Sequence, residues 1–432
     1  MTTGLEARRL AADAFLRIMK EGVVLEIALE SLPGFDQLET RDRAFARAIL
    51  ATSFRHLGQT RTVLQRFLSK PLDETAPPAR AILVTGATQL LWLDTPPHAA
   101  VSASVSLAET WPQARKLKGL INAVLRKVAA QGKAIATRLP PQDNLPEWLR
   151  QAWRTQYGPG LTARIAAGVL KPPPLDLSLR DPGSLQDFAA SLQGKALPTG
   201  TLRLEKAGDI TQLAGFDEGG WWAQDAAAAL PARLLAVEPG DNVIDLCAAP
   251  GGKTLQLAAA GANVTAVDTS AGRLKRLREN LKRTGLKAEV VTADARKWKP
   301  ERQANHVLLD APCSATGTLR RHPESSWIKS PEDVARFGKV QRELARAASK
   351  MVHPGGRLVV CTCSLQAEEG EALARDILKR DKTLEADPVS EAELPGLSEA
   401  LTPEGWVRTT PAMWKESGGL DGFFIARFRK SG

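Results

Sequence analysis

One stretch of the sequence, Asp245-Leu246-Cys247-Ala248-Ala249-Pro250-Gly251-Gly252-Lys253-Thr254, decides the predicted fold. Val243 and Ile244 lead into it as part of an apolar run that is typical of a buried strand. The small residues that follow allow backbone amides to approach a ligand closely before a helix begins. We therefore predict a cofactor-binding loop made of Cys247, Ala248, Ala249, Pro250, Gly251, Gly252 and Lys253.

Two common nucleotide-binding motifs are excluded by counting along this loop. The phosphate-binding motif GxxxxGK[ST] requires a glycine five residues before Gly252, but that position is Cys247. The dinucleotide motif GxGxxG is absent as well. We therefore expect a cofactor that the loop holds without gripping a phosphate chain.

From residue 221 onward the sequence alternates between strand-like and helix-like segments. The expected strands lie at 242–246, 263–267, 289–292, 306–309 and 356–361, and the expected helices start at 253, include 274–281 and span 331–351. This alternation predicts a parallel sheet with crossover helices that cover both of its faces. We assign an α/β domain to residues 221–432.

Acidic residues mark the ends of successive predicted strands. Besides Asp245 they are Asp268, Asp294 and Asp310. Each one alone is explained by an N-cap between a strand and a helix, but together they indicate a shared pocket at the carboxyl edge of the sheet. Asp268 lies 23 residues after Asp245, which suits a carboxylate that binds a ribose diol. A ribose without phosphates fits adenosine joined to an uncharged or cationic group, and this indicates S-adenosylmethionine.

The first 140 residues indicate helices only. Apolar side chains such as Leu10, Ala14 and Ile18 recur at helical spacing, and proline pairs divide the region into helix-sized pieces. We predict an all-helical domain at residues 1–140. The composition then changes, and residues 141–220 are expected to form a small α/β unit.

The chain carries more basic than acidic side chains. Its 432 residues include 58 Lys plus Arg against 48 Asp plus Glu, a formal charge of +10. This balance favours a polyanionic partner such as nucleic acid, and a solvated basic surface is an equally good explanation. The charge is concentrated at 101–140, with seven basic residues and one acidic residue. We interpret that stretch as a footprint for RNA phosphates, with a solvated helix face as the alternative.

Other classes of protein are excluded by what the sequence lacks. It has no run of about 18 apolar residues and no signal-like apolar segment at its start, so we expect a cytoplasmic protein without a membrane partner. Its four cysteines form no CxxC pair, and no histidine stands at metal-ligand spacing, so neither a disulfide framework nor a metal site is expected. We expect a monomer.

Two of the cysteines suggest covalent catalysis. Cys313 and Cys363 each follow an apolar strand-like run, at the sheet edge where the cofactor loop is expected. A thiolate adds readily to an unsaturated carbon, so two thiols at one cofactor pocket suggest chemistry on an electron-poor ring such as a pyrimidine. The alternative is that both are buried thiols without a role. We assign Cys361 to packing, and Cys247 to packing or to lining the loop through its backbone.

Several motifs together resemble the RNA (cytosine-5) methyltransferases. They are the loop at 245–253, Asp310-Ala311-Pro312-Cys313, Arg321-His322-Pro323-Glu324 and Thr362-Cys363-Ser364. The helical region ends in residues 120–127, Leu-Ile-Asn-Ala-Val-Leu-Arg-Lys, which resemble the NusB fold. Over essentially its whole length the chain is similar to the bacterial 16S ribosomal RNA methyltransferase B family.

The resemblance implies a multidomain protein, in which a NusB-like helical domain and a small α/β subdomain precede a Rossmann-like class I methyltransferase fold with a seven-stranded sheet. It implies that the protein forms 5-methylcytosine in 16S ribosomal RNA with S-adenosylmethionine as cofactor. It also implies that Cys363 adds to carbon 6 of cytosine and that Cys313 assists product release. The residues alone leave the ranking of the thiols open, because DNA cytosine methyltransferases use a Pro-Cys thiol for addition.

Two other functions agree with the same sequence. A transfer RNA cytosine-5 methyltransferase would share every catalytic residue, and a non-catalytic RNA-binding assembly factor could keep the fold. Possession of both Cys313 and Cys363 beside the loop counts against the second. We further expect Asp310 to accept a hydrogen bond from the cytosine amino group or the cofactor, and Arg320 and Arg321 to contact RNA phosphates.

Overall fold

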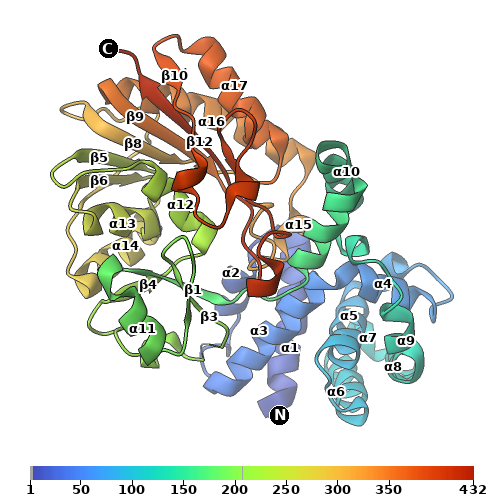
Figure 1. The fold of residues 1–432 in the computed structure, drawn as a ribbon. Coiled ribbons are helices and arrows are strands. Elements are labelled where there is room, and N and C mark those ends of the chain that lie inside the picture. The colour runs from blue at the N-terminus through green and yellow to red at the C-terminus, as the bar shows by residue number, and fades with distance from the viewer. Residues whose placement is uncertain (1–2, 207) are drawn as a thin grey trace. The chain divides into compact units, whose positions relative to one another are not determined.

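The structure is a computed structural model that describes residues 3–206 and 208–432. The chain divides into two compact units, and each is described separately (Figure 1). The first consists of Met1–Lys171 with Leu319–Ser330, and the second of Pro172–Thr318 with Pro331–Gly432. The domain boundaries expected at residues 140 and 220 stay predictions.

The first unit is helical, as the sequence predicts. Its helices are α1 (Thr3–Glu21), α2 (Leu25–Glu30), α3 (Thr40–Arg55), α4 (Leu57–Gln65), α5 (Pro77–Trp92), α6 (Pro97–Thr110), α7 (Pro112–Arg115), α8 (Lys118–Lys127), α9 (Lys133–Ala136), α10 (Glu147–Val169) and α15 (Ser325–Ile328). Helices α5 and α6 start at prolines, which suit the first turn of a helix because their missing N–H needs no partner there. Helix α5 is buried on nearly all sides and packs against α1, α3, α4, α6 and α8.

A segment from far along the chain, Leu319–Ser330, belongs to this helical unit. The Glu324 carboxylate accepts a hydrogen bond from the backbone N–H of Leu25 at 3.1 Å. The Arg55 guanidinium donates to the backbone carbonyl of Arg320 at 2.8 Å. The Arg320 side chain is buried, so the sequence-based expectation that Arg320 contacts RNA phosphates is wrong.

The second unit begins with a small antiparallel sheet. Its strands are β1 (Leu175–Leu179), β2 (Lys195–Ala196), β3 (Leu202–Leu204) and β4 (Trp221–Ala223), in the order β2-β3-β1-β4, with helix α11 (Leu185–Ser191) between β1 and β2 in sequence. A buried ion pair between Arg203 and Asp176, at 2.7 Å, joins β3 to β1.

The larger sheet of the second unit is mixed. Its strands are β5 (Asn242–Leu246), β6 (Asn263–Asp268), β7 (Glu289–Thr292), β8 (Ala304–Asp310), β9 (Val352–Thr362), β10 (Leu384–Ala386), β11 (Val407–Arg408) and β12 (Phe424–Lys430). They run in the order β10-β12-β9-β8-β5-β6-β7, and β11 pairs with β12. Strands β5 to β9 are parallel, as predicted, whereas β12 lies antiparallel to β9 and to β10.

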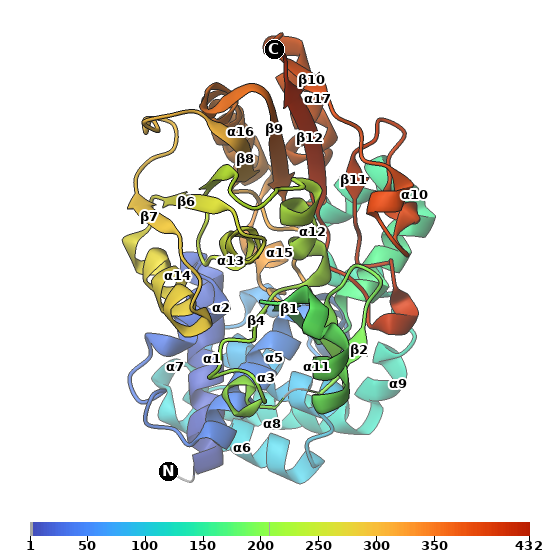
Figure 2. The ribbon, with the colours of Figure 1, turned by 60° about the vertical axis from the view of Figure 1, so that its left-hand side comes forward.

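Helices cover both faces of this sheet (Figures 1 and 2). One face carries α12 (Ala226–Leu234), α13 (Gly252–Ala259) and α14 (Ala271–Thr284), and the other carries α16 (Pro331–Met351) and α17 (Glu371–Arg380). The carboxyl ends of the parallel strands therefore meet at one edge, where open α/β sheets bind ligands.

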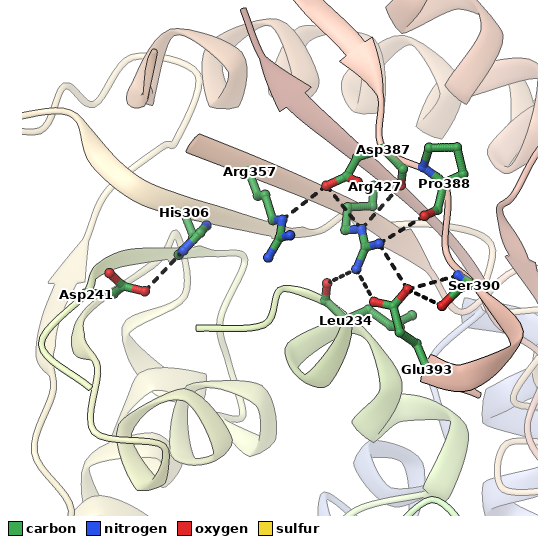
Figure 3. Close-up of polar contacts among 9 residues, drawn as sticks. All are labelled: Leu234, Asp241, His306, Arg357, Asp387, Pro388, Ser390, Glu393 and Arg427. Carbon is green, nitrogen blue, oxygen red and sulfur yellow. Dashed lines mark hydrogen bonds and ion pairs between the residues drawn. The ribbon is translucent and has the colours of Figure 1, made fainter. Parts of the chain in front are cut away.

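A polar cluster surrounds Arg427 of β12 (Figure 3). The Arg427 guanidinium is buried and donates to both carboxylate oxygens of Glu393, at 2.6 and 3.2 Å. It also donates to the backbone carbonyls of Leu234 and Pro388, at 2.9 and 3.0 Å. A charged side chain at this depth is stable because every one of these partners is an acceptor.

This cluster predicts an acid-dependent loss of stability. Burial by itself would raise the pKa of Glu393, but hydrogen bonds from Arg427 and Ser390 outweigh it and lower the pKa to about 2 from the usual 4.5. The pair therefore contributes its stability above about pH 4.5, and loses it as the pH falls from 4.5 toward 2. In thermal unfolding, Glu393→Gln should be less stable than the wild type at pH 7, and the difference should shrink in that acid range. The exposed neighbour variant Glu391→Gln should follow the wild type at every pH.

Candidate functional site

A cavity of about 510 Å³ lies at the carboxyl edge of the large sheet. This volume is in the range of about 300–1,000 Å³ that is usual for small-molecule sites. Of the residues predicted from the sequence, those that line it are Cys247, Ala249, Asp268, Asp294, Asp310, Cys313 and Cys363. The remaining predicted loop residues, which are not among the lining residues, are Ala248, Pro250, Gly251, Gly252 and Lys253. The structure therefore places three of the predicted strand-end carboxylates and both predicted thiols around one cavity.

The loop after β5 depends on a glycine at position 251. Gly251 has a φ of 110°, in the region that favours glycine, and caps the start of α13. A Cβ atom there would lie 2.2 Å from the Leu277 side chain of α14. Below the loop, the buried Asp245 carboxyl accepts a hydrogen bond from the Thr254 hydroxyl at 2.6 Å. Burial raises the pKa of Asp245 to about 7. Asp245 therefore supports the loop from below and is not a lining residue.

Asp268 occupies the end of β6 with both of its oxygens engaged. It accepts hydrogen bonds from the backbone N–H groups of Ala249 and Ser270, at 3.2 and 2.9 Å. The Arg273 guanidinium of α14 donates to both oxygens, at 2.9 and 3.0 Å. The Asp268 side chain is 1% exposed whereas that of Arg273 is 58% exposed. Arg273 is therefore the partner with room to move away when a ligand needs the carboxylate.

Lys253 and Asp310 form a second ion pair next to the Cys313 loop. Lys253 Nζ lies 2.7 Å from Asp310 Oδ2, and the lysine side chain is only 9% exposed. Burial alone would lower the pKa of Lys253, but the charge of Asp310 and their hydrogen bond raise it above its usual value. The buried Cys361 thiol donates to the other oxygen of Asp310 at 3.4 Å. Cys361 was assigned to packing, and the structure adds this contact. Lys253 thus supports the site through Asp310.

The two predicted thiols are neighbours. Cys313 follows β8 and Cys363 follows β9, and their Sγ atoms lie 3.4 Å apart. The hydrogen bond to Cys363, followed by burial, raises the pKa of Cys313 well above its usual range. These surroundings therefore favour the protonated form of the Cys313 thiol.

Comparisons with known proteins identify the family of this chain. A model of the family described as 16S rRNA methyltransferase RsmB/F matches residues 232–429, and a model of the NusB family matches residues 5–130. Ribosomal RNA small subunit methyltransferase B from Klebsiella pneumoniae is 32% identical, with 100% of this chain and 99% of that protein covered. The chain belongs to the RsmB/F family of 16S rRNA methyltransferases.

Solved structures support the same fold for this RsmB/F family member. The crystal structure of PH0851 superposes with a TM-score of 0.77 at 23% identity and covers 99% of both chains. NSun6 from Pyrococcus horikoshii, solved with SFG, superposes with a TM-score of 0.56 at 21% identity and covers 66% of this chain and 98% of its own. The family and the fold class predicted from the sequence are confirmed, and the chain is an enzyme, a methyltransferase.

Some residues of the site were missed by the sequence analysis. Phe337, Val340 and Leu344 of α16 line the cavity. They recur at helical spacing, so the amphipathic pattern of α16 could have indicated them. Arg296, which also lines the cavity, pairs with Asp294 at 2.8 Å, and the hydrogen bonds from Arg296 lower the pKa of Asp294. No sequence pattern indicates that pairing.

The described residues contain neither a membrane-spanning helix nor a cluster of metal-binding side chains. No helix within residues 3–206 and 208–432 has the length and the apolar character needed to cross a lipid bilayer. In the same residues, no three or more His, Cys, Asp or Glu side chains are grouped so that they could hold a metal ion.

Proposed function

We propose that this enzyme forms 5-methylcytosine in 16S ribosomal RNA with S-adenosylmethionine as methyl donor, through a covalent bond between Cys363 and carbon 6 of the base. The observation that carries the proposal is the pair of thiols 3.4 Å apart beside a cavity lined by strand-end carboxylates. The family and the name of the Klebsiella relative support the choice of ribosomal RNA. We place the enzyme in the cytoplasm with this substrate.

The residues around the cavity fit S-adenosylmethionine by their chemistry. Asp268 provides carboxylate oxygens for the hydroxyls of a ribose, and Val267 and Ala293 provide apolar surface for a purine. Position 251 favours glycine, because its φ is 110° and a Cβ atom there would lie 2.2 Å from the Leu277 side chain of α14. When bound, the cofactor supplies an electrophilic methyl group on a sulfonium. Asp294 and Asp310 add acceptors on the same cavity.

The protein's own task is to make carbon 5 of cytosine nucleophilic. The Cys363 thiolate adds to carbon 6, and the ring electrons move to carbon 5, which then takes the methyl group. A base then takes the proton from carbon 5, and the electron pair left behind restores the ring double bond as the bond between Cys363 Sγ and carbon 6 breaks. The base gains a methyl group and loses a hydrogen, and the thiolate is regenerated.

The surroundings of Cys313 support these roles. Its contact with Cys363 and its burial raise its pKa, which suits a thiol that does not attack the base, and the Thr362-Cys363-Ser364 motif supports Cys363 as the nucleophile. Asp310 ends β8, three residues before Cys313, and is paired with Lys253 of α13. Its carboxylate lines the cavity and is available to accept a hydrogen bond from the cytosine amino group. We propose that Cys313 assists the release of the methylated base.

A methylation assay tests the proposal. Purified protein is incubated with methyl-labelled S-adenosylmethionine and either unmodified 16S ribosomal RNA or transfer RNA, and the RNA is digested to nucleosides. We expect label in 5-methylcytidine from 16S ribosomal RNA alone. Label in transfer RNA instead would favour a transfer RNA cytosine-5 methyltransferase, and RNA binding without any label would favour a non-catalytic assembly factor.

Cofactor binding gives a separate prediction for Asp268. Asp268→Ala should weaken S-adenosylmethionine binding by about 2 kcal/mol, or about 30-fold, because charge-assisted hydrogen bonds are lost. Arg273→Ala is the matched control, since it removes the exposed partner of Asp268 and keeps the carboxylate. That variant should bind at least as tightly as the wild type. Calorimetry that finds unchanged affinity for Asp268→Ala would exclude the carboxylate from the cofactor site.

A further inference from the structure

Glu369 is a fully buried carboxylate that the chemistry above does not use. It ends a short 3-10 helix, Ala367–Glu369, which follows the Cys363 loop in sequence. A buried carboxylate costs free energy unless it is hydrogen-bonded, so its partners explain why it is there. Those partners come from both thiol-bearing loops.

Each catalytic thiol is followed by a serine that donates to Glu369. Ser314, directly after Cys313, donates its backbone N–H to Glu369 Oε1 at 2.9 Å and its hydroxyl to Oε2 at 2.5 Å. Ser364, directly after Cys363, donates its hydroxyl to Oε2 at 2.6 Å. One carboxylate oxygen thus receives a hydroxyl from each loop, although the two serines are 50 residues apart in sequence.

A third element is connected to the same carboxylate. Gln341 of α16 donates its side-chain N–H to the backbone carbonyl of Pro312 at 2.9 Å and to Glu369 Oε1 at 3.2 Å. Cys313 therefore stands between two residues, Pro312 and Ser314, that are both fixed by the Gln341 and Glu369 side chains. The position of the Cys313 sulfur is therefore set by hydrogen bonds to the backbone of the residues before and after it.

The hydroxyl groups around Glu369 form a hydrogen-bond network in which the Glu369 carboxylate is the last acceptor. The backbone N–H of Gln366 donates to the Ser364 hydroxyl at 3.0 Å, which leaves the Ser364 proton for the carboxylate. The backbone N–H of Leu365 donates to the Thr316 hydroxyl at 3.0 Å, and that hydroxyl lies 3.2 Å from Ser364. Donors on every side fit a carboxylate and would leave an apolar or amide side chain poorly matched.

We infer that Glu369 is a positioning residue that sets the spacing of the two thiols and keeps a negative charge behind Cys313. The inference rests on the proposed function for its role in methyl transfer. The geometry that it explains, Sγ atoms 3.4 Å apart on two separate loops, is a property of the protein alone. Both parts of the role can therefore be measured without RNA or cofactor.

Burial raises the pKa of Glu369, and the hydrogen bonds from Ser314 and Ser364 oppose this by favouring its charged form. That charge acts on Cys313. The pKa of the Cys313 thiol is raised first by its hydrogen bond to Cys363, then by burial, and then by the charges of Cys363 and Glu369. Cys363 and Glu369 are the titratable groups with the largest effect on this pKa, and Asp310, Asp268, Asp294, Arg273, Arg296 and Cys247 line the same cavity as Cys313. If Glu369 loses its charge, Cys313 should ionise at lower pH, while its hydrogen bond to Cys363 and its burial continue to raise its pKa.

The spacing is tested by the rate at which the two thiols close into a disulfide. The probe is diamide, whose nitrogen–nitrogen double bond takes up the two electrons and two protons that the thiols lose. In the wild type the sulfurs start 3.4 Å apart, so closure should be fast. Glu369→Asp keeps the charge but is one methylene shorter, and should slow closure by about 10-fold because it no longer reaches both serines. Glu369→Gln should slow it similarly.

The charge is tested by the pH profile of Cys313 alkylation with iodoacetamide, read out by peptide mass spectrometry. Glu369→Gln should move the midpoint of this profile down by about one pH unit, because a nearby negative charge is removed. Glu369→Asp should leave the midpoint in place. A merely structural glutamate would not separate the two variants in this way.

The controls keep the test decisive if a variant folds poorly. Glu368→Gln makes the same change at the exposed preceding residue, and should match the wild type in both assays. Ser364→Ala retains the carboxylate and removes one donor, so it should slow disulfide closure without moving the alkylation midpoint. Thermal unfolding confirms that each variant is folded.

The outcomes separate this inference from the proposed function. Slower closure in Glu369→Asp and a shifted midpoint in Glu369→Gln support it even in an enzyme without methylation activity. Wild-type closure rates and midpoints in both variants overturn it, even if the wild-type enzyme methylates ribosomal RNA as proposed.

Discussion

Cys363→Ala should abolish methyl transfer, lowering the rate by about 10⁴-fold or more, and should leave no covalent complex with RNA. The reason is that carbon 5 of cytosine becomes nucleophilic only after a thiolate adds to carbon 6. Cys313, whose sulfur lies 3.4 Å from that of Cys363, does not replace the missing thiolate, because burial and the charge of Glu369 still raise its pKa once Cys363 is gone. Turnover and adduct formation should therefore be lost together.

This variant is measured with labelled methyl transfer and with denaturing gels that reveal a protein–RNA adduct. Cys361→Ala is the matched control, since it removes a thiol two residues earlier, within the strand β9 that Cys363 follows. It loses only a contact to Asp310 and should cost far less activity. If Cys363→Ala still methylates RNA at a rate near that of the wild type, the covalent mechanism through Cys363 is wrong.

The parts of the fold that the sequence predicts are those with a local signal. Strands β5 to β9 are buried in a parallel sheet, so they appear in the sequence as apolar runs, and α16 starts and ends where its periodicity does. Strand β12 was not predicted, because its place beside β9 is fixed by long-range pairing. Local patterns do not contain such pairings.

The site shows the same limit. The cysteines and carboxylates were found because each ends a recognisable strand, and the structure brings them to one cavity. Which carboxylate holds which cation was not predictable, since the pairing of Lys253 with Asp310 joins residues 57 positions apart. The contact of Glu369 with Ser314 joins residues 55 positions apart. The burial of Arg320 depends on packing within the helical unit, to which Leu319–Ser330 belongs although most of that unit is the N-terminal part of the chain.

Cys313→Ala is expected to fail at a different step from Cys363→Ala. The Cys363 thiolate remains, so the base can still be attacked and methylated. Release is slowed because the thiol beside the Cys363 sulfur, at 3.4 Å, is gone. A denaturation-resistant RNA adduct should therefore accumulate during turnover, and the overall rate should fall by roughly 10²-fold or more, the scale of a lost proton-transfer group.

Denaturing gels on RNA incubated with S-adenosylmethionine distinguish the roles of the two thiols. The adduct should be abundant with Cys313→Ala, and it should disappear in the double variant Cys313→Ala and Cys363→Ala, because its carbon–sulfur bond is made by Cys363. Peptide mapping of the adduct identifies the attached residue. An adduct that forms with Cys363→Ala and is attached to Cys313 would reverse the assignment, and the raised pKa of Cys313 would then have to fall when RNA binds. The two single variants therefore decide which thiol bonds to the base and which thiol assists the release of the methylated product.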